Sequence, residues 1–181
     1  MKKFSCVFIV VLIFALMLTA CTGFEKSHID RYTISYCSAD NEPVWIEKVN
    51  FDQYPVKSGG GMMGGWKMAM GSIVLFPPPP VPKQIYIYWF NYRQQVFYEA
   101  TVPLQENAEE IMYSLPKPRF GGPLLVTGVL PDGTAVVWVA NGSNANFSVW
   151  IEVGRTKGHL AEGDPASRKN TTEEMRQRGE I

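Results

Sequence analysis

The chain has 181 residues, a mass of 20.3 kDa, and equal numbers of basic and acidic side chains, 17 of each. With 46% hydrophobic and 19% charged residues, it has the composition of one globular domain, or at most two, and not of a disordered chain. A zero net charge argues against nucleic-acid binding, which needs a clear basic excess. Without the first 20 residues, 15 basic and 17 acidic side chains remain, so neither a strongly basic nor a strongly acidic surface is expected.

Residues 1–20 have the pattern of a secretory signal peptide. Lys2 and Lys3 precede residues 4–18, a run of 15 residues in which Ser5 is the only polar one. An α-helix needs about 20 residues to cross a bilayer, so this run predicts a cleaved signal and not a membrane span.

The end of this signal resembles a bacterial lipobox. Leu18, Thr19, Ala20 and Cys21 supply the aliphatic residue, the two small residues and the cysteine. The resemblance implies cleavage between Ala20 and Cys21, with acyl chains then carried by Cys21, and two such chains already give a stable membrane anchor. Thr22 follows in place of aspartate, which implies the outer membrane of a Gram-negative envelope, with the domain facing the periplasm. The alternative is an ordinary signal peptide followed by a chance cysteine.

The chain has three cysteines, and they predict a mature domain without an internal disulfide. Cys6 leaves with the signal and Cys21 carries the lipid, so Cys37 remains alone. Cys37 lies in a stretch that alternates like a strand. A buried small apolar residue is the favoured interpretation, and a reactive thiol is the alternative.

Alternation of side chains with a period of two, rich in aromatic and β-branched residues, predicts seven to eight short strands. In the second strand, Val44, Ile46 and Lys48 are expected to share one face, with Trp45 and Val49 on the other. The expected strands, in chain order, are residues 32–37, 44–49, 73–76, 85–90, 95–102, 124–130, 135–140 and 147–153.

One clear helix is expected over residues 106–114, where an apolar stripe recurs at helical spacing and Pro116 then stops the helix. Residues 155–181 are polar and are expected to be mostly irregular, with a short final helix capped around residues 171–174 as an option. Short turns join neighbouring strands, so the pairing should be mostly antiparallel. The prediction is a mainly β domain over residues 31–181, either an antiparallel β-sandwich or a curled sheet with one short helix packed on it.

Residues 51–72 contain six glycines, which predicts a long mobile loop that carries Trp66. Such a loop cannot easily bury all its apolar side chains, and methionine-rich surfaces adapt to partners. The loop is therefore the candidate protein-binding element, and the alternative is a lid over the domain's own core. Its candidate binding residues are Met62, Met63, Trp66, Met68 and Met70.

The sequence offers few residues for catalysis, metals or cofactors. Residues 59–64 match the pattern G-x-G-x-x-G, but no helix or βαβ unit surrounds them, so dinucleotide binding is not expected. His28 and His159 are the only histidines, and there is no G-x-S-x-G motif. Glu47, Glu99 and Glu152 are expected on solvated strand faces. The chain is therefore predicted to be no enzyme and to hold no metal or small-molecule cofactor.

Several segments resemble the uncharacterised proteobacterial lipoproteins grouped as domain-of-unknown-function family twenty-nine thirty-one. The matching residues are 43–47, 65–66, 82–89, 96–98, 108–112, 128–138 and 150–158. The resemblance supplies no catalytic residues. It implies a link to phospholipase effectors of the type VI secretion system, and hence a periplasmic immunity protein that binds an incoming lipase.

Two classes of function therefore remain open. A binding module should expose an apolar patch larger than a few hundred Å². A structural or envelope-maintenance lipoprotein without a tight soluble partner should have an evenly polar surface.

Overall fold

The computed structural model describes residues 32–56, 60–62, 65–74, 80–117 and 122–181, without the side chains of residues 62 and 71–74. The predicted signal peptide, cleavage site and tether lie outside these residues, as does most of the proline run. No helix among the described residues is long and apolar enough to cross a membrane.

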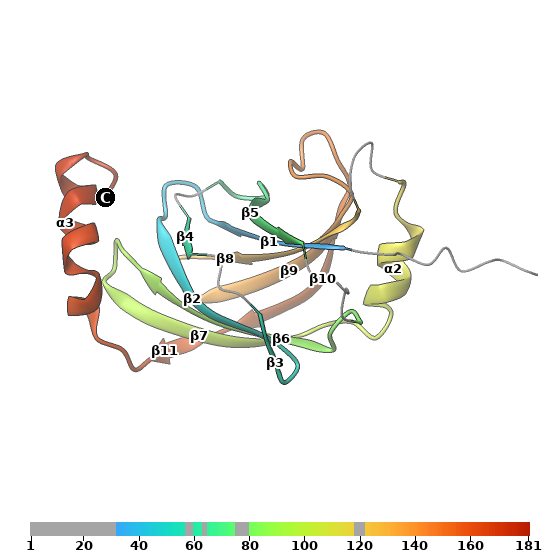
Figure 1. Cartoon of the computed structure of the whole chain (residues 1–181), viewed down its shortest axis with the longest axis horizontal. Coiled ribbons are helices and arrows are strands. Elements are labelled where there is room, and N and C mark those ends of the chain that lie inside the picture. The colour runs from blue at the N-terminus through green and yellow to red at the C-terminus, as the bar shows by residue number, and fades with distance from the viewer. Residues whose placement is uncertain (1–31, 57–59, 63–64, 75–79, 118–121) are drawn as a thin grey trace, which may run out of the picture.

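Two sheets pack face to face in a mainly β fold, as expected (Figure 1). The first, sheet A, has five strands in the order β10-β9-β8-β1-β5. The second, sheet B, has six, in the order β11-β7-β6-β2-β3 with β4 also paired to β2. Sheet A consists of β1 (Thr33–Ser38), β5 (Met70–Val74), β8 (Leu124–Val129), β9 (Thr134–Ala140) and β10 (Trp150–Lys157). Sheet B consists of β2 (Val44–Phe51), β3 (Tyr54–Val56), β4 (Gly60–Met62), β6 (Gln84–Asn91), β7 (Val96–Pro103) and β11 (His159–Ala161).

Pairing between neighbouring strands is antiparallel, except that β1 runs parallel to β8 with Thr33 opposite Leu124. Antiparallel β5 then closes the far side of β1. This one parallel pair places a strand from the start of the domain in the middle of sheet A, between two strands that come later in the chain.

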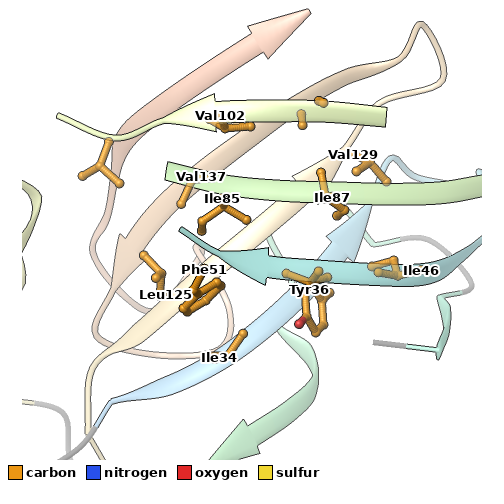
Figure 2. Packing of buried hydrophobic residues seen from close by; sticks show 14 of the residues in the cluster. Ile34, Tyr36, Ile46, Phe51, Ile85, Ile87, Val102, Leu125, Val129 and Val137 are labelled. Carbon is orange, nitrogen blue, oxygen red and sulfur yellow. The ribbon is translucent and has the colours of Figure 1, made fainter. Parts of the chain in front are cut away.

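The inner faces of the two sheets form one apolar core (Figure 2). Ile34 and Tyr36 of β1 and Ile85 and Ile87 of β6 all point into this core, and all four side chains are fully buried. Each such aliphatic side chain gains roughly 1.5–3 kcal/mol on burial, so this layer is the main source of stability.

The predicted face of Lys48 is wrong, because β2 contains a β-bulge. The pairing of β2 with β6 shifts register between Ile46 and Lys48. The extra residue reverses the alternation, so that Val49 joins Ile46 in the core and Lys48 is exposed. Simple period-two counting cannot see such an insertion.

Those of residues 51–72 that the structure describes do not form the predicted loop. Their described parts pair at the edges of both sheets, β3 and β4 with β2, and β5 with β1. These edge strands are held by backbone hydrogen bonds, which a glycine makes as well as any other residue. Together with β11, the short strands β3 and β4 raise the number of described strands to eleven, above the predicted seven to eight.

The predicted strand over residues 147–153 begins later than expected. Phe147 precedes the strand, its amide donating to the Asn144 carbonyl at 3.1 Å, and β10 starts only at Trp150. The connection from β9 to β10 is therefore longer than the expected strand bounds allow, because the Val149 amide donates to the Asn141 side chain and not to a neighbouring strand.

Helix α2 (Ala108–Ser114) matches the expected helix, and Ala108 and Met112 bury its apolar side in the core. Residues 155–181 are not irregular: they continue β10 and then form β11, a 3-10 turn η1 (Pro165–Arg168) and helix α3 (Lys169–Gln177). Met175 of α3 is buried with Phe90 and Phe97 of sheet B. The two helices lie at opposite ends of the sandwich (Figure 1).

Candidate functional site

The outer face of sheet A carries a second, smaller apolar cluster. It is built on alternate residues of β1, β8 and β9, among them Cys37, Val126 and Trp138. Trp66 lies edge-on to Trp138 with 4.9 Å between ring centroids, and Trp150 packs on Trp138 at 5.7 Å. These three tryptophans shield the face from water.

The segment that carries Trp66 is joined to the loop that precedes Trp150. We call residues 65–70 the Trp66 segment and residues 141–149 the asparagine loop. The Ala69 amide donates to the Ser143 carbonyl at 2.7 Å, and the Ala145 amide donates to the Lys67 carbonyl at 3.2 Å. Met68 and Asn144 form an isolated antiparallel bridge. Segments about 75 residues apart in sequence therefore make one surface.

Trp66 is fixed in place and is not carried on a free loop. Its amide donates to a carboxylate oxygen of Asp40 at 2.9 Å, and its ring is half-buried against Trp138. The Met68 amide of the same segment donates to the Gly65 carbonyl at 3.0 Å, which closes a turn within the segment. Trp66 therefore matches the alternative prediction, in which this segment is a lid over part of the domain's own core.

Cys37 is fully buried beneath this cover. Burial raises the pKa of its thiol to about 12, so the thiolate is scarce at neutral pH. This agrees with the favoured interpretation of Cys37 as a small apolar core residue.

The outside of the cover is apolar where it meets solvent. Of the six large apolar side chains exposed among the described residues, four belong to the two joined segments. They are Phe147 (90% exposed), Met68 (45%), Val149 (42%) and Met70 (39%). The other two, Tyr54 and Leu160, lie on sheet B.

The remaining predicted site residues lie elsewhere or outside the description. Met62 ends β4, opposite Val44 of β2, and its side chain is not described. Met63, Ala20 and Cys21 lie outside the described residues. The structure therefore brings together Trp66, Met68 and Met70, and it adds Phe147 and Val149, which sequence reasoning placed in a strand. The run of asparagines before Phe147 was the signal that could have placed it in a turn.

A group of hydrogen-bonded polar side chains lies on the outer face of sheet B. The Tyr86 hydroxyl donates to Glu99 at 2.7 Å, and His159 Nε2 lies 3.0 Å from the other carboxylate oxygen. The hydrogen bond from Tyr86, followed by that from His159, lowers the pKa of Glu99, while burial and Glu99 raise the pKa of Tyr86 to about 12. Tyr86 is thus held protonated at neutral pH, which disfavours it as a nucleophile. Glu99 was expected to be simply solvated, and it is instead the centre of this group.

Glu47 is also paired, which corrects the expectation of a solvated carboxylate. Arg168 donates to Glu47 at 2.6 Å, and its guanidinium lies 4.3 Å from the Trp45 ring centroid. The interaction ties η1 to β2 and so holds the C-terminal segment against sheet B. Within the described part of the chain, no group of three His, Cys, Asp or Glu side chains is placed to hold a metal ion.

Comparison with protein families gives a match over most of the chain. The model of the family described as "Protein of unknown function (DUF2931)" matches residues 24–179, which is most of the chain. The chain belongs to this family. The match confirms the family that the sequence resembles, and it spans every strand and helix of the described fold. No curated protein matches the chain. No solved structure matches it either.

Proposed function

We propose that this member of the family is a lipid-anchored periplasmic lipoprotein that acts as a non-catalytic binding module. The observation that carries the proposal is the concentration of exposed apolar side chains on the Trp66 segment and the asparagine loop, where four of the six described ones lie. Apolar side chains that gather on a monomer surface mark a contact site more often than scattered ones do. An evenly polar surface, the expectation for a purely structural lipoprotein, is not what these segments present.

The underlying structure suits a recognition surface. The exposed Met68 and Met70 alternate along the chain with Ala69, which packs into the covered cluster. The backbone under them is held by the bonds to Asp40 and Ser143, so binding has little backbone entropy to overcome. Methionine side chains on that fixed backbone can still adapt their shape to a partner. A fixed base with adaptable apolar side chains favours a protein partner over a small polar ligand.

The finer form of the proposal is an immunity protein that blocks a secreted phospholipase effector. Its support is the resemblance to lipoproteins of this kind together with the predicted anchor. An anchor at Cys21 would hold the binding surface close to the membrane that a lipase attacks. A structural or envelope-maintenance role is the competing function, and the experiment below separates the two.

The test is capture of a partner by the full-length protein, extracted in mild detergent from its own envelope. The binding variant combines Met68→Ser and Met70→Ser. The matched control combines Tyr54→Ser and Leu160→Ser, which removes two exposed apolar side chains from sheet B. We expect the wild type and the control to retain a stoichiometric partner, and the binding variant to bind that partner at least tenfold more weakly. Burial of two such side chains is worth about 1.4 kcal/mol or more, which corresponds to a tenfold change in affinity.

Equal retention by both variants would place the binding surface elsewhere, and the absence of any stoichiometric partner would favour the envelope role. A captured phospholipase that loses activity on binding would support immunity. A captured protein of another class would support the binding module and reject immunity.

A further inference from the structure

The asparagine loop projects from the end of the domain where the chain leads back to the predicted anchor. Thr33, at the start of β1, is opposite Leu124 of β8, and Leu124 is opposite Ala140 of β9. Ala140 is opposite Trp150, and the loop connects these two residues. In Figure 1 the orange loop and the start of β1 lie on the same side of the sandwich, away from α3.

The length of chain before β1 limits how far this end can lie from the bilayer. Ten residues lie between Cys21 and Tyr32, so the two positions are eleven residue-to-residue steps apart. Fully extended, they span at most about 40 Å, which is comparable to the size of a small domain. An acylated Cys21 would therefore keep the start of β1 within about 40 Å of the membrane, so that this end of the domain can reach the lipid surface.

The chemistry of the loop suits a lipid interface. Residues 141–149 contain no charged side chain, so the loop can approach headgroups without a cost for desolvating charge. The Phe147 ring is 90% exposed, which is unusual for so large an apolar group.

Phe147 is presented by a constrained loop. The Val149 amide donates to the Asn141 side chain at 2.8 Å, and the Asn146 amide donates to the Asn144 side chain at 2.8 Å. These bonds satisfy the loop's polar backbone from within and leave the aromatic ring outside. A ring held in water in this way gains free energy by entering an apolar phase, and little of that gain is spent on ordering the loop.

We propose that the asparagine loop is a membrane-contact element, with Phe147 inserted at the boundary between lipid headgroups and acyl chains and Val149 beside it. The inference rests on the proposed anchor at Cys21 and extends it. One aromatic side chain binds lipid only weakly alone, but the acyl chains already hold the domain at the surface, so Phe147 acts to orient it. In this orientation Met68 and Met70, on the adjoining segment, lie close to the membrane surface.

The test uses a fluorescent probe at single introduced cysteines in the full-length lipoprotein. F147C places the probe on the loop, and L160C places it on β11, near α3, where the native side chain is also exposed. Cys37 is buried with a raised pKa and should stay unlabelled in the folded protein. The mature proteins are reconstituted in phosphatidylethanolamine and phosphatidylcholine vesicles that contain brominated lipid, and their intact masses establish whether Cys21 is acylated.

We expect quenching and a blue shift of emission for the probe at position 147, and neither for the probe at position 160. Equal behaviour of the two probes in an acylated protein would overturn the membrane-contact element while leaving the anchor intact. An intact protein mass without acyl chains would overturn the anchor at Cys21. An unquenched probe at position 147 in that protein would overturn both the anchor and the membrane-contact element. Shielding of position 147 only after addition of envelope proteins would assign the loop to a protein partner and reject the lipid contact.

Discussion

Asp132 shows how single side chains stabilise the turns of this domain. It lies between β8 and β9, where its carboxylate accepts a hydrogen bond from the Thr134 amide at 2.9 Å and pairs with Lys157 at 2.8 Å. The hydrogen bond from Lys157 first, and that from Thr134 next, lower the pKa of Asp132 from 3.8 to about 2. The sequence Pro131-Asp132-Gly133 is typical of a tight turn, but nothing local to it indicates Lys157, which is 25 residues later.

The depressed pKa leads to a prediction about acid stability. A carboxyl group with a lower pKa in the folded state stabilises the fold above its unfolded pKa, and that contribution is lost as the pH falls from about 4 to about 2. Asp132→Asn keeps an acceptor for Thr134 but removes the charge. Because Asp132 and Lys157 are more than half exposed, we expect the variant to lose only about 1 kcal/mol or less at neutral pH.

Urea unfolding of wild type and Asp132→Asn at pH 6, pH 4 and pH 2 would check this. The two free energies of unfolding should converge at the lowest pH. A difference that stays constant over the whole range would mean that the charge of Asp132 does not stabilise the fold.

The Trp66 segment is the element on which sequence and structure differ most. Its glycines and methionines predicted a mobile loop, because they show no regular alternation of apolar and polar residues that would indicate a strand. What organises it is tertiary: the bond to Asp40, the bridge to Asn144 and the ring contact with Trp138 all come from distant parts of the chain. By contrast, the strong strands β6 and β9 were predictable within one or two residues, since burial imposes their pattern locally.

This arrangement predicts that substitutions at neighbouring positions lower the free energy of unfolding by different amounts. Trp66→Ala should lower the free energy of unfolding by about 2 kcal/mol, because it removes a half-buried ring from Trp138. Met68→Ala, at an exposed position, should cost less than about 0.5 kcal/mol.

Chemical unfolding would measure both values, and alkylation of Cys37 in the folded protein would give a second readout. Cys37 should react faster in Trp66→Ala than in Met68→Ala, since the ring helps to cover it. Equal reaction rates and equal stabilities would show that Trp66 is not part of the cover.

The whole molecule combines a closed interior with one apolar surface near the end that leads to the predicted anchor. The sandwich class followed from strand count and turn spacing, and α3 matches the final helix that the sequence offered as an option. The edge strands and the β2 bulge did not follow, because each depends on contacts between residues far apart in sequence. The same limit applied to the candidate site. Met68 and Met70 were predicted, whereas Phe147 and Val149 join them only through the pairing of two distant segments.

The central claim is that the part of this surface formed by Met68 and Met70 contacts a protein partner while the chain is anchored in the envelope. The most direct measurement is photo-crosslinking in living cells, with a photoreactive amino acid placed at Met68 or, as a control, at Leu160 of the full-length lipoprotein. Our account predicts a discrete membrane-associated adduct of one partner at position 68, and none at position 160. Identical patterns at both positions, or no adduct at position 68, would contradict it.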